Sequence, residues 1–249
     1  MSCIIPYNGN STGKILNTFK IKIMMCNGLI LKNSYMENKK GTDSLSVPPE
    51  INTMIKKSKQ ISIVQSQIEE SIALKQKIKS ELAENVVKLA EILNNCLKKG
   101  GKILLCGNGG SAADAQHIAG ELVVRLKSSS KRKALPAIAL TVNSSVLTAA
   151  ANDFGFEKVF SRQVEALGKR GDCLLAFSTS GESSNVNLAV KAARKIGMKT
   201  LALSGKDGGE MSKIADFSII IPSSETQRIQ EVHILIGHIV CDLIEREFE

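Results

Sequence analysis

The sequence predicts an α/β protein in which a doubly wound, five-stranded parallel sheet is flanked by helices and preceded by N-terminal helices. Two observations predict this class. After residue 100, five short apolar runs alternate with stretches of helical periodicity, as in a parallel sheet that crossover helices bury on both faces. The first run also ends in a glycine-rich turn that leads directly into a helix, at the edge where such sheets bind ligands.

The N-terminal part of the chain differs in composition from the rest. Asn, Ser, Lys and Gly are scattered through residues 1–50, and the Pro48-Pro49 pair then interrupts the chain. These residues lack the long apolar core and small-residue cleavage site of a signal peptide. We interpret residues 1–50 as a weakly ordered extension, with an over-long start and true initiation near Met36 as the alternative. Residues 51–249 then form one domain.

The elements of this domain follow from periodicity and punctuation. Residues 51–99 are predicted to be helical, because Leu82, Val86, Leu89 and Leu93 recur at helical spacing before the Gly100-Gly101 pair ends the pattern. The predicted strands are 103–106, 137–141, 173–177, 200–203 and 217–221, and the helices between them are 111–126, 157–167 and 184–196. The last helix, about 225–248, is apolar nearly all round, so it is expected in the core or between subunits.

Charge and composition restrict the partners. The chain has 33 Lys and Arg against 24 Asp and Glu, and 4% aromatic residues. So low an aromatic content leaves few rings that could stack on nucleic-acid bases. We therefore predict that the partner of this basic chain is an anionic small molecule and not a nucleic acid. The one dense basic cluster, Lys127, Lys131, Arg132 and Lys133, is interpreted as a solvated loop.

Two further features concern membranes and redox state. No apolar stretch is long enough for a membrane-spanning helix, so no membrane partner is expected. The six cysteines show no C-x-x-C pair and no metal-type spacing. A reducing, cytoplasmic location is therefore predicted.

The glycine-rich turn Cys106-Gly-Asn-Gly-Gly-Ser111 is the first candidate binding segment. Its glycines let the backbone approach a ligand, and the following helix offers free N–H groups, with Ser111 as a candidate cap. It is not a Walker loop, because no Lys-Ser/Thr pair follows. The dinucleotide fingerprint fits only loosely, since Ala112 replaces the third glycine and the chain turns basic where an acid is required. A purely structural turn is the alternative.

A second candidate follows the third predicted strand. The segment Ser178-Thr-Ser-Gly-Glu-Ser183 places hydroxyls and backbone N–H groups just before a helix, an arrangement that suits a phosphate dianion. The alternative is a serine-rich loop with an N-cap. Its position at the carboxyl end of a strand favours phosphate.

The three histidines lie in two segments. His117 follows the glycine-rich turn, and Glu121 is four residues on, about 40° away around an ideal helix. Such a pair serves a proton relay or a metal, although an ordinary surface pair is the alternative. His233 and His238 point roughly 140° apart on the last helix, so they do not serve one site within a subunit. We interpret His233 as a core residue or as one that faces a neighbouring subunit, whereas Gly237 leaves room beside His238.

Five segments, taken in order, resemble the sugar-isomerase (SIS) domain family. They are 106–117 with Glu121, 151–156, 178–183, 205–209, and 228–233 with His238. The likeness spans about 55–248, and five segments in register are far more specific than any one of them. Residues 1–50 have no counterpart in ordinary members.

The resemblance implies a homotetramer with active sites between subunits. It implies that the substrate phosphate lies on Ser178, Thr179, Ser180 and Ser183. It implies that the sugar is held by Asn108, Gly109, Gly110, Ser111, Glu121, Asn152, Asp153 and Gln230. The family's zinc ligands match His117, Glu121, Gln230 and His238, with one zinc per subunit. Gln230 and His238 are roughly 12 Å apart along an ideal helix.

The implied activity is that of the family's heptose-phosphate branch. Sedoheptulose 7-phosphate would be converted through an enediol into D-glycero-D-manno-heptose 7-phosphate for bacterial surface heptose, with Glu121 as the base and His238 as the acid. The alternatives are a non-catalytic relative that binds the bacterial replication initiator protein, a sugar-phosphate sensor, and an isomerase of another phosphosugar. The regulator branch lacks the acid four residues after the first histidine, so the presence of Glu121 favours the enzyme.

Overall fold

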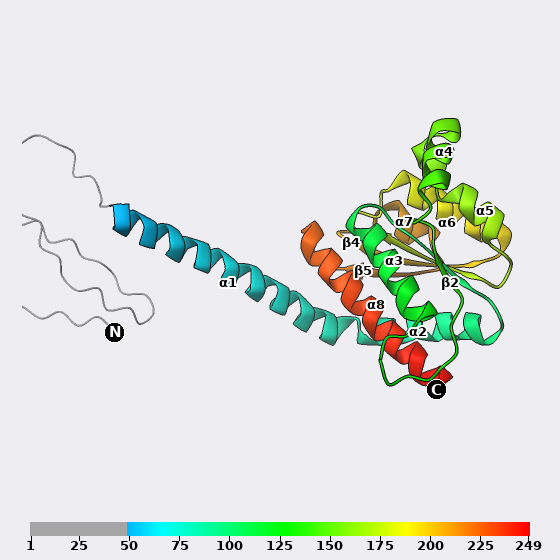
Figure 1. Cartoon of the computed structure of the whole chain (residues 1–249), viewed down its shortest axis with the longest axis horizontal. Helices are drawn as coiled ribbons and strands as arrows, with labels where there is room; N and C mark the ends of the chain where they lie inside the picture. Colours follow the sequence, from blue (N-terminus) through cyan, green and yellow to red (C-terminus); the bar gives the residue numbers. More distant parts are fainter. Residues whose placement is uncertain (1–48) are drawn as a thin grey trace, which may run out of the picture. The chain divides into compact units, whose positions relative to one another are not determined.

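The computed structural model describes residues 49–249, with side chains from residue 52 onwards (Figure 1). The extension predicted over residues 1–50 lies outside this part of the chain except for its last two residues, so it stays a prediction. The first helix, α1 (Pro49–Glu81), starts at a proline, which is tolerated there because a first-turn N–H has no helical partner. Leu82 separates α1 from α2 (Ala83–Lys98), and the helical prediction for 51–99 is confirmed.

Five parallel strands form the sheet, each at a predicted apolar run. They are β1 (Ile103–Cys106), β2 (Ala137–Ala139), β3 (Cys173–Ser178), β4 (Lys199–Gly205) and β5 (Phe217–Ile221). The order β2-β1-β3-β4-β5 means that the winding direction reverses between β1 and β3. In doubly wound sheets this reversal opens a crevice at the carboxyl ends of the two strands. The glycine-rich and serine-rich turns follow these two strands.

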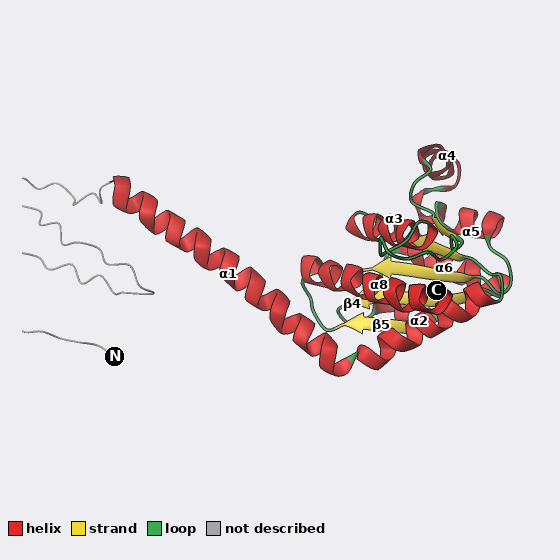
Figure 2. Cartoon of the chain, turned by 60° about the horizontal axis from the view of Figure 1, so that its bottom comes forward, coloured by secondary structure: helices red, strands yellow, loops and turns green. Residues whose placement is uncertain are grey.

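Helices cover both faces of the sheet (Figure 2). They are α3 (Gly110–Val123), α4 (Ser144–Phe154), the 3₁₀ turn η1 (Phe156–Lys158), α5 (Ser161–Leu167), α6 (Ser184–Ile196), α7 (Gly209–Ile214) and α8 (Thr226–Phe248). Two of these helices, α4 and α7, were not predicted, and the helix predicted over 157–167 is divided into η1 and α5. At the start of α4, the Asn143 side chain accepts a hydrogen bond from the Val146 N–H, which satisfies one unpaired helical donor.

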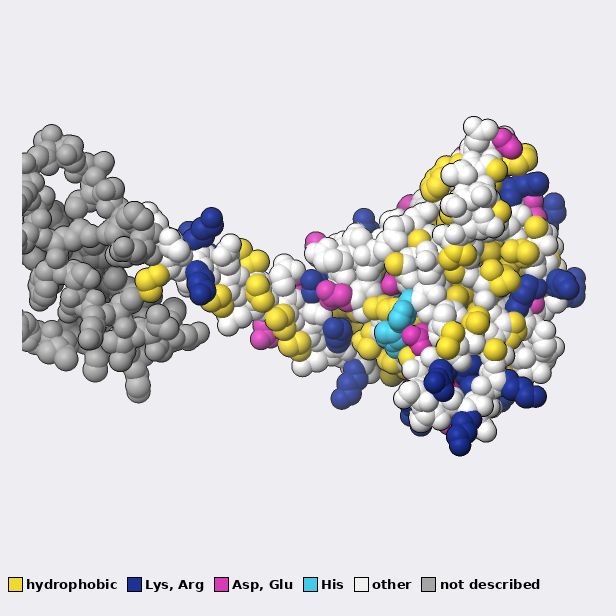
Figure 3. All heavy atoms as spheres, viewed as in Figure 1, with side chains coloured by type: hydrophobic (Ala, Val, Ile, Leu, Met, Phe, Trp, Pro, Cys, Tyr) yellow, Lys and Arg dark blue, Asp and Glu magenta, His cyan; other side chains and the backbone are white. Residues whose placement is uncertain are grey.

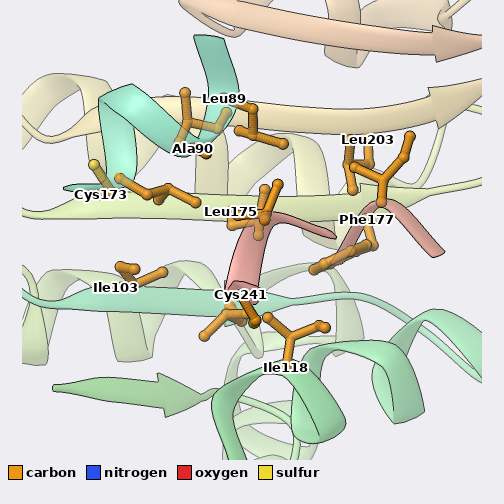
Figure 4. Packing of buried hydrophobic residues seen from close by; sticks show 14 of the residues in the cluster. Leu89, Ala90, Ile103, Ile118, Cys173, Leu175, Phe177, Leu203 and Cys241 are labelled. Carbon is orange, nitrogen blue, oxygen red and sulfur yellow. The ribbon is translucent and has the colours of Figure 1, made fainter. Parts of the chain in front are cut away.

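The core consists of two clusters separated by the sheet. Alternate residues of β3 point to opposite faces, so that Leu175 and Phe177 face α2, α3 and α8, whereas Leu174 faces the α5 and α6 side. Figure 4 shows Leu175 and Phe177 in the first cluster. The prediction that α8 is buried in the core is confirmed along one face, where Ile229, Val232, Ile236, Val240 and Ile244 are buried.

The first helix is exposed over most of its length. Ile61, Val64, Ile68 and Ile72 recur every three or four residues, and each is at least 44% exposed, so they form one apolar stripe on the helix. Within residues 49–249, no helix has both the length and the hydropathy of a membrane span.

Candidate active site

The glycine-rich turn joins β1 to α3 through Gly107, Asn108 and Gly109. Gly109 occupies the N-cap position with φ 53°, a conformation that favours glycine. At Gly110 a Cβ atom would lie 2.4 Å from Nε2 of Gln230, so the missing side chain lets α8 approach the turn. Ser111 lies inside the first helical turn, 3% exposed, and no side-chain hydrogen bond caps the helix. The expectation that Ser111 caps α3 is therefore wrong.

The serine-rich turn folds around its own hydroxyl groups. The Oγ atoms of Ser178 and Ser183 are 3.0 Å apart, and the Gly181 N–H donates to Ser178 Oγ at 3.1 Å. Ser183 is the N-cap residue of α6. The hydroxyls thus gather at the positive end of a helix dipole, which is a suitable environment for a phosphate.

The segment 205–209 and the first turn of α7 pack against the serine-rich turn. The Met211 N–H donates to the Gly181 carbonyl at 2.9 Å, and the Glu210 N–H donates to the Glu182 carboxylate at 2.8 Å. A Cβ atom on Gly181 would lie 2.0 Å from the Gly208 carbonyl oxygen. The backbone of the serine-rich turn is therefore packed directly against the backbone of the segment 205–209.

One residue that was not predicted joins the glycine-rich turn to α6, the helix that follows the serine-rich turn. Asn185 lies in the first turn of α6, is 3% exposed, and exchanges two side-chain amide hydrogen bonds with Asn108 of 2.8 and 2.9 Å. This pair crosses the crevice between β1 and β3. The sequence carried no signal for it, because an asparagine near a helix start is common and its partner is 77 residues away.

The imidazoles of His117 and His238 and the carboxylate of Glu121 form one cluster. The two imidazole Nε2 atoms are 2.8 Å apart, and His117 Nε2 is 3.3 Å from Glu121 Oε1. One potential ligand atom from each residue lies within 4.8 Å of the others. Figure 3 shows the exposed histidine atoms as one group beside an acidic side chain. The His117–Glu121 pair is thus more than an isolated surface pair.

The packing of α3 against α8 assembles this cluster. A Cβ atom on Gly237 would lie 2.4 Å from Ile118 Cδ1, so the glycine allows the close approach that brings His238 to His117. At the other end of the contact, Gln230 packs against Gly110. Within the chain Gln230 therefore adjoins the glycine-rich turn, and its assignment as a metal ligand stays a prediction.

The third histidine, His233, lies in the hydrophobic core, away from the cluster. His233 is 0% exposed, lies 3.2 Å from the Ser204 carbonyl oxygen through Nε2, and meets the Phe177 ring edge to face. Burial lowers its pKa to about 4, so the ring is neutral at physiological pH. This agrees with its interpretation as a core residue.

The two remaining sugar-binding candidates lie on α4. Asn152 and Asp153 are exposed, and the Asn152 amide donates to the Asp153 carboxylate at 2.8 Å. Among residues 49–249, no hydrogen bond links either side chain to the glycine-rich or serine-rich turn. The structure therefore does not bring them together with the other candidates.

Asp114 was not singled out in the sequence, although it lies one turn before His117. Burial raises its pKa to about 6, while His117 acts in the opposite direction. Its buried Oδ2 has no hydrogen-bond partner. A carboxylate of raised pKa beside this cluster is typical of functional sites.

The donor atoms of the cluster fit a zinc ion. Two imidazole nitrogens and a carboxylate oxygen are the protein ligands of many catalytic zinc sites, which keep one position open. These ligand atoms come from His117, His238 and Glu121. The cluster therefore combines metal-binding groups with groups able to transfer protons.

The fold and this site define a class of protein. The sequence profile of the SIS domain matches residues 67–205, and the chain belongs to the SIS domain family. The resemblance noted in the sequence is thereby confirmed.

Several relatives of this chain are named phosphoheptose isomerase. The chain is 52% identical to the phosphoheptose isomerase of Clostridium acetobutylicum over 188 residues, covering 75% of this chain and 95% of the relative. A solved phosphoheptose isomerase from Neisseria gonorrhoeae has 46% identity and a TM-score of 0.70, covering 75% of this chain and 99% of that one. Another, from Francisella tularensis, has 38% identity and a TM-score of 0.72, covering 75% and 98%.

Proposed function

We propose that this chain is a phosphoheptose isomerase, which converts sedoheptulose 7-phosphate into D-glycero-D-manno-heptose 7-phosphate for bacterial surface heptose. The observation that carries the proposal is the His117–Glu121–His238 cluster in a chain whose relatives have that name. The serine-rich turn adds a phosphate site at the same edge of the sheet.

The reaction moves a proton between two adjacent carbons through an enediol. It requires a base that takes a proton from the carbon beside the carbonyl and an acid that returns one. Glu121 is the base, because its carboxylate is within the cluster and its side chain is 18% exposed and so reachable. His238 is the acid, since its imidazole is partly exposed on the facing helix.

The two turns bind the rest of the substrate. Ser178, Thr179, Ser180 and Ser183 hold the phosphate at the start of α6. Asn108, Gly109, Gly110, Ser111 and Gln230 hold the sugar. Asn152 and Asp153 complete the sugar site, and their exposure on α4 leaves them free to reach a neighbouring subunit.

Zinc is the proposed cofactor, held by His117, Glu121, Gln230 and His238, with one ion per subunit. When bound, it would polarise the substrate carbonyl or hold the hydroxyls. Glu121 then has two roles that oppose each other, because a carboxylate bound tightly to a metal is a poorer base. The ligand set and the base are therefore tested separately.

Replacing His238 by Ala is expected to weaken zinc binding by at least about 10–100-fold, because one of three clustered donors is lost. Affinity is measured on metal-free protein by competition with a chromophoric chelator. Ile239→Ala, which changes an exposed neighbour on the same helix, is the control. Gln230→Ala decides whether the amide is a fourth ligand. If the zinc affinity of His238→Ala were unchanged, His238 would not be a zinc ligand.

The proposed assembly is a homotetramer in the cytoplasm. The exposed stripe of Ile61, Val64, Ile68 and Ile72 supports association, because exposed apolar rows of this kind mark interfaces. Four described cysteines, Cys96, Cys106, Cys173 and Cys241, are buried free thiols, as in proteins of reducing compartments.

One preparation tests activity and assembly together. Purified full-length chain with added zinc is expected to form heptose 7-phosphate from sedoheptulose 7-phosphate, and light scattering is expected to give the mass of four chains. Hexose and pentose phosphates are compared in the same assay. A stable tetramer without turnover of any of these sugars would contradict an isomerase and favour a non-catalytic member of the family.

A further inference from the structure

The loop between α3 and β2 contains the basic cluster for which the proposed reaction gives no role. Its three lysines are exposed, and the interpretation as a solvated loop holds for Lys131 and Lys133, whereas Lys127 forms an ion pair with Asp242 of α8. The interpretation is wrong for Arg132, whose side chain is 2% exposed. A buried arginine requires hydrogen-bond acceptors for its donors.

Arg132 contacts the end of α3 and a carboxylate of α8 at once. Its Nη2 donates to the Glu121 carbonyl at 2.7 Å, and Nη1 donates to the Leu122 carbonyl at 2.9 Å. Carbonyls in the last turn of a helix lack helical partners, and a cation there also interacts favourably with the helix dipole. The same guanidinium donates from Nε to Glu245 Oε2 at 3.0 Å.

Glu245 is as deeply buried as Arg132, and both of its oxygens are occupied. Oε1 accepts from the Lys127 N–H at 2.9 Å, and Oε2 accepts from the Leu126 N–H at 3.0 Å as well as from Arg132. Burial opposes ionisation, but the two amides and the Arg132 charge outweigh it and lower the pKa of Glu245. The carboxylate therefore stays charged at neutral pH and fixes the loop to α8.

The positions of these residues relate the ion pair to the candidate active site. Glu245 is seven residues after His238, two helical turns on and about 20° away on an ideal helix. It therefore lies on the face of α8 that packs against α3. At the other end of the contact, Arg132 binds the main chain of Glu121 itself. One buried ion pair thus links the backbone of the proposed base to the helix of the proposed acid.

We propose that Arg132 and Glu245 are positioning residues that hold His117 and Glu121 of α3 at the distance from His238 that the reaction requires. The catalytic part of this inference rests on the proposed function. Within residues 49–249, the side-chain hydrogen bonds of Arg132 and Glu245 go to each other, to the end of α3 and to the loop that follows it, so their effect on the site is exerted through the packing of α3 against α8. A displacement of about 1 Å at reacting groups costs on the order of 100-fold in rate.

The variant Arg132→Lys tests the inference. Lysine keeps the charge but cannot donate to Glu245, Glu121 and Leu122 together. Lys131→Gln, which removes an exposed charge from the same loop, is the control. The full-length chain contains three histidines, so a spectrum of protein whose histidines carry ¹³C at Cε1 alone has three imidazole signals. We expect those of His117 and His238 to move in Arg132→Lys while the buried His233 signal stays, and all three to stay in Lys131→Gln.

Kinetics provide a second measurement. In Arg132→Lys we expect kcat to fall by about 10–100-fold with KM for sedoheptulose 7-phosphate changed by less than about threefold, since the substrate turns are intact. Unchanged histidine signals and unchanged kcat, with only a lower Tm, would overturn the proposal and leave a stabilising ion pair. If wild-type protein shows no turnover, the proposed function fails, but the histidine signals still decide the positioning role.

A variant that does not fold also leads to a decision. Glu245→Gln keeps the shape of the side chain and is then measured in the same way, with the same shifts of His117 and His238 expected. Loss of the fold in both Arg132→Lys and Glu245→Gln would overturn the proposal, because the ion pair would then be a requirement of folding rather than a positioning device.

Discussion

Replacing Glu121 by Gln is expected to lower kcat for sedoheptulose 7-phosphate by about 10²–10⁴-fold, the range that a general base contributes. The amide has the shape of the carboxylate but cannot take a proton. The side chain is 18% exposed and makes one 3.3 Å contact to His117, so water can solvate the amide and the fold is expected to persist. KM should change little, because the phosphate and sugar turns are unaltered.

The measurement must separate the role of Glu121 as the proposed base from its role as a proposed zinc ligand. Turnover is measured at saturating zinc, and bound zinc is measured in the same samples, so that a weaker metal site is not mistaken for a missing base. Glu165→Gln, which alters an exposed carboxylate in a surface ion pair with Arg162, is expected to retain full activity. If Glu121→Gln turns over at the wild-type rate with zinc bound, another group is the base, and Asp114, whose pKa burial raises to about 6, becomes the next carboxylate to test.

The fold could be predicted from the sequence where local pattern and tertiary burial agree. All five strands were recognisable because each is a short apolar run, and β3, for instance, is buried along its whole length. The helix α4 was missed for the opposite reason. Of its residues only Ala150 is buried, and Leu147 and Ala151 pack only partly against the core, so the apolar stripe is too short to give a clear periodic signal. The helix α7 has six residues, too few for a periodic signal.

The site was predictable only in part, because its members come together through tertiary contacts. The four-residue spacing of His117 and Glu121 is a local feature, and helical geometry alone places the two side chains on one face. His238 lies beside His117 because Gly237 packs against Ile118 of another helix. No local sequence pattern specifies that contact. Arg132 appeared as one of four basic residues, and its buried partner Glu245 is 113 residues away.

Replacing Gly181 by Ala is expected to destabilise the protein by roughly 2–5 kcal/mol, for two separable reasons. Gly181 has φ 69°, and an L residue pays about 1–2 kcal/mol in that region. Its Cβ would also lie 2.0 Å from the Gly208 carbonyl oxygen and 2.9 Å from the Gly209 nitrogen. These are backbone atoms that cannot rotate away, so one turn must move, at about 1–3 kcal/mol.

The control Gly171→Ala separates the two costs. Gly171 has φ 91°, but nothing lies within 4 Å of its Cβ position, so this variant bears only the conformational cost. The difference between the two unfolding free energies, measured in denaturant, therefore reports the clash alone. Because the clash pushes on the serine-rich turn, KM for the phosphorylated substrate should rise in Gly181→Ala and stay constant in Gly171→Ala. If Gly181→Ala and Gly171→Ala had equal stabilities and equal KM values, the serine-rich turn would not be rigidly packed against Gly208 and Gly209. Gly181 would then not shape the phosphate site.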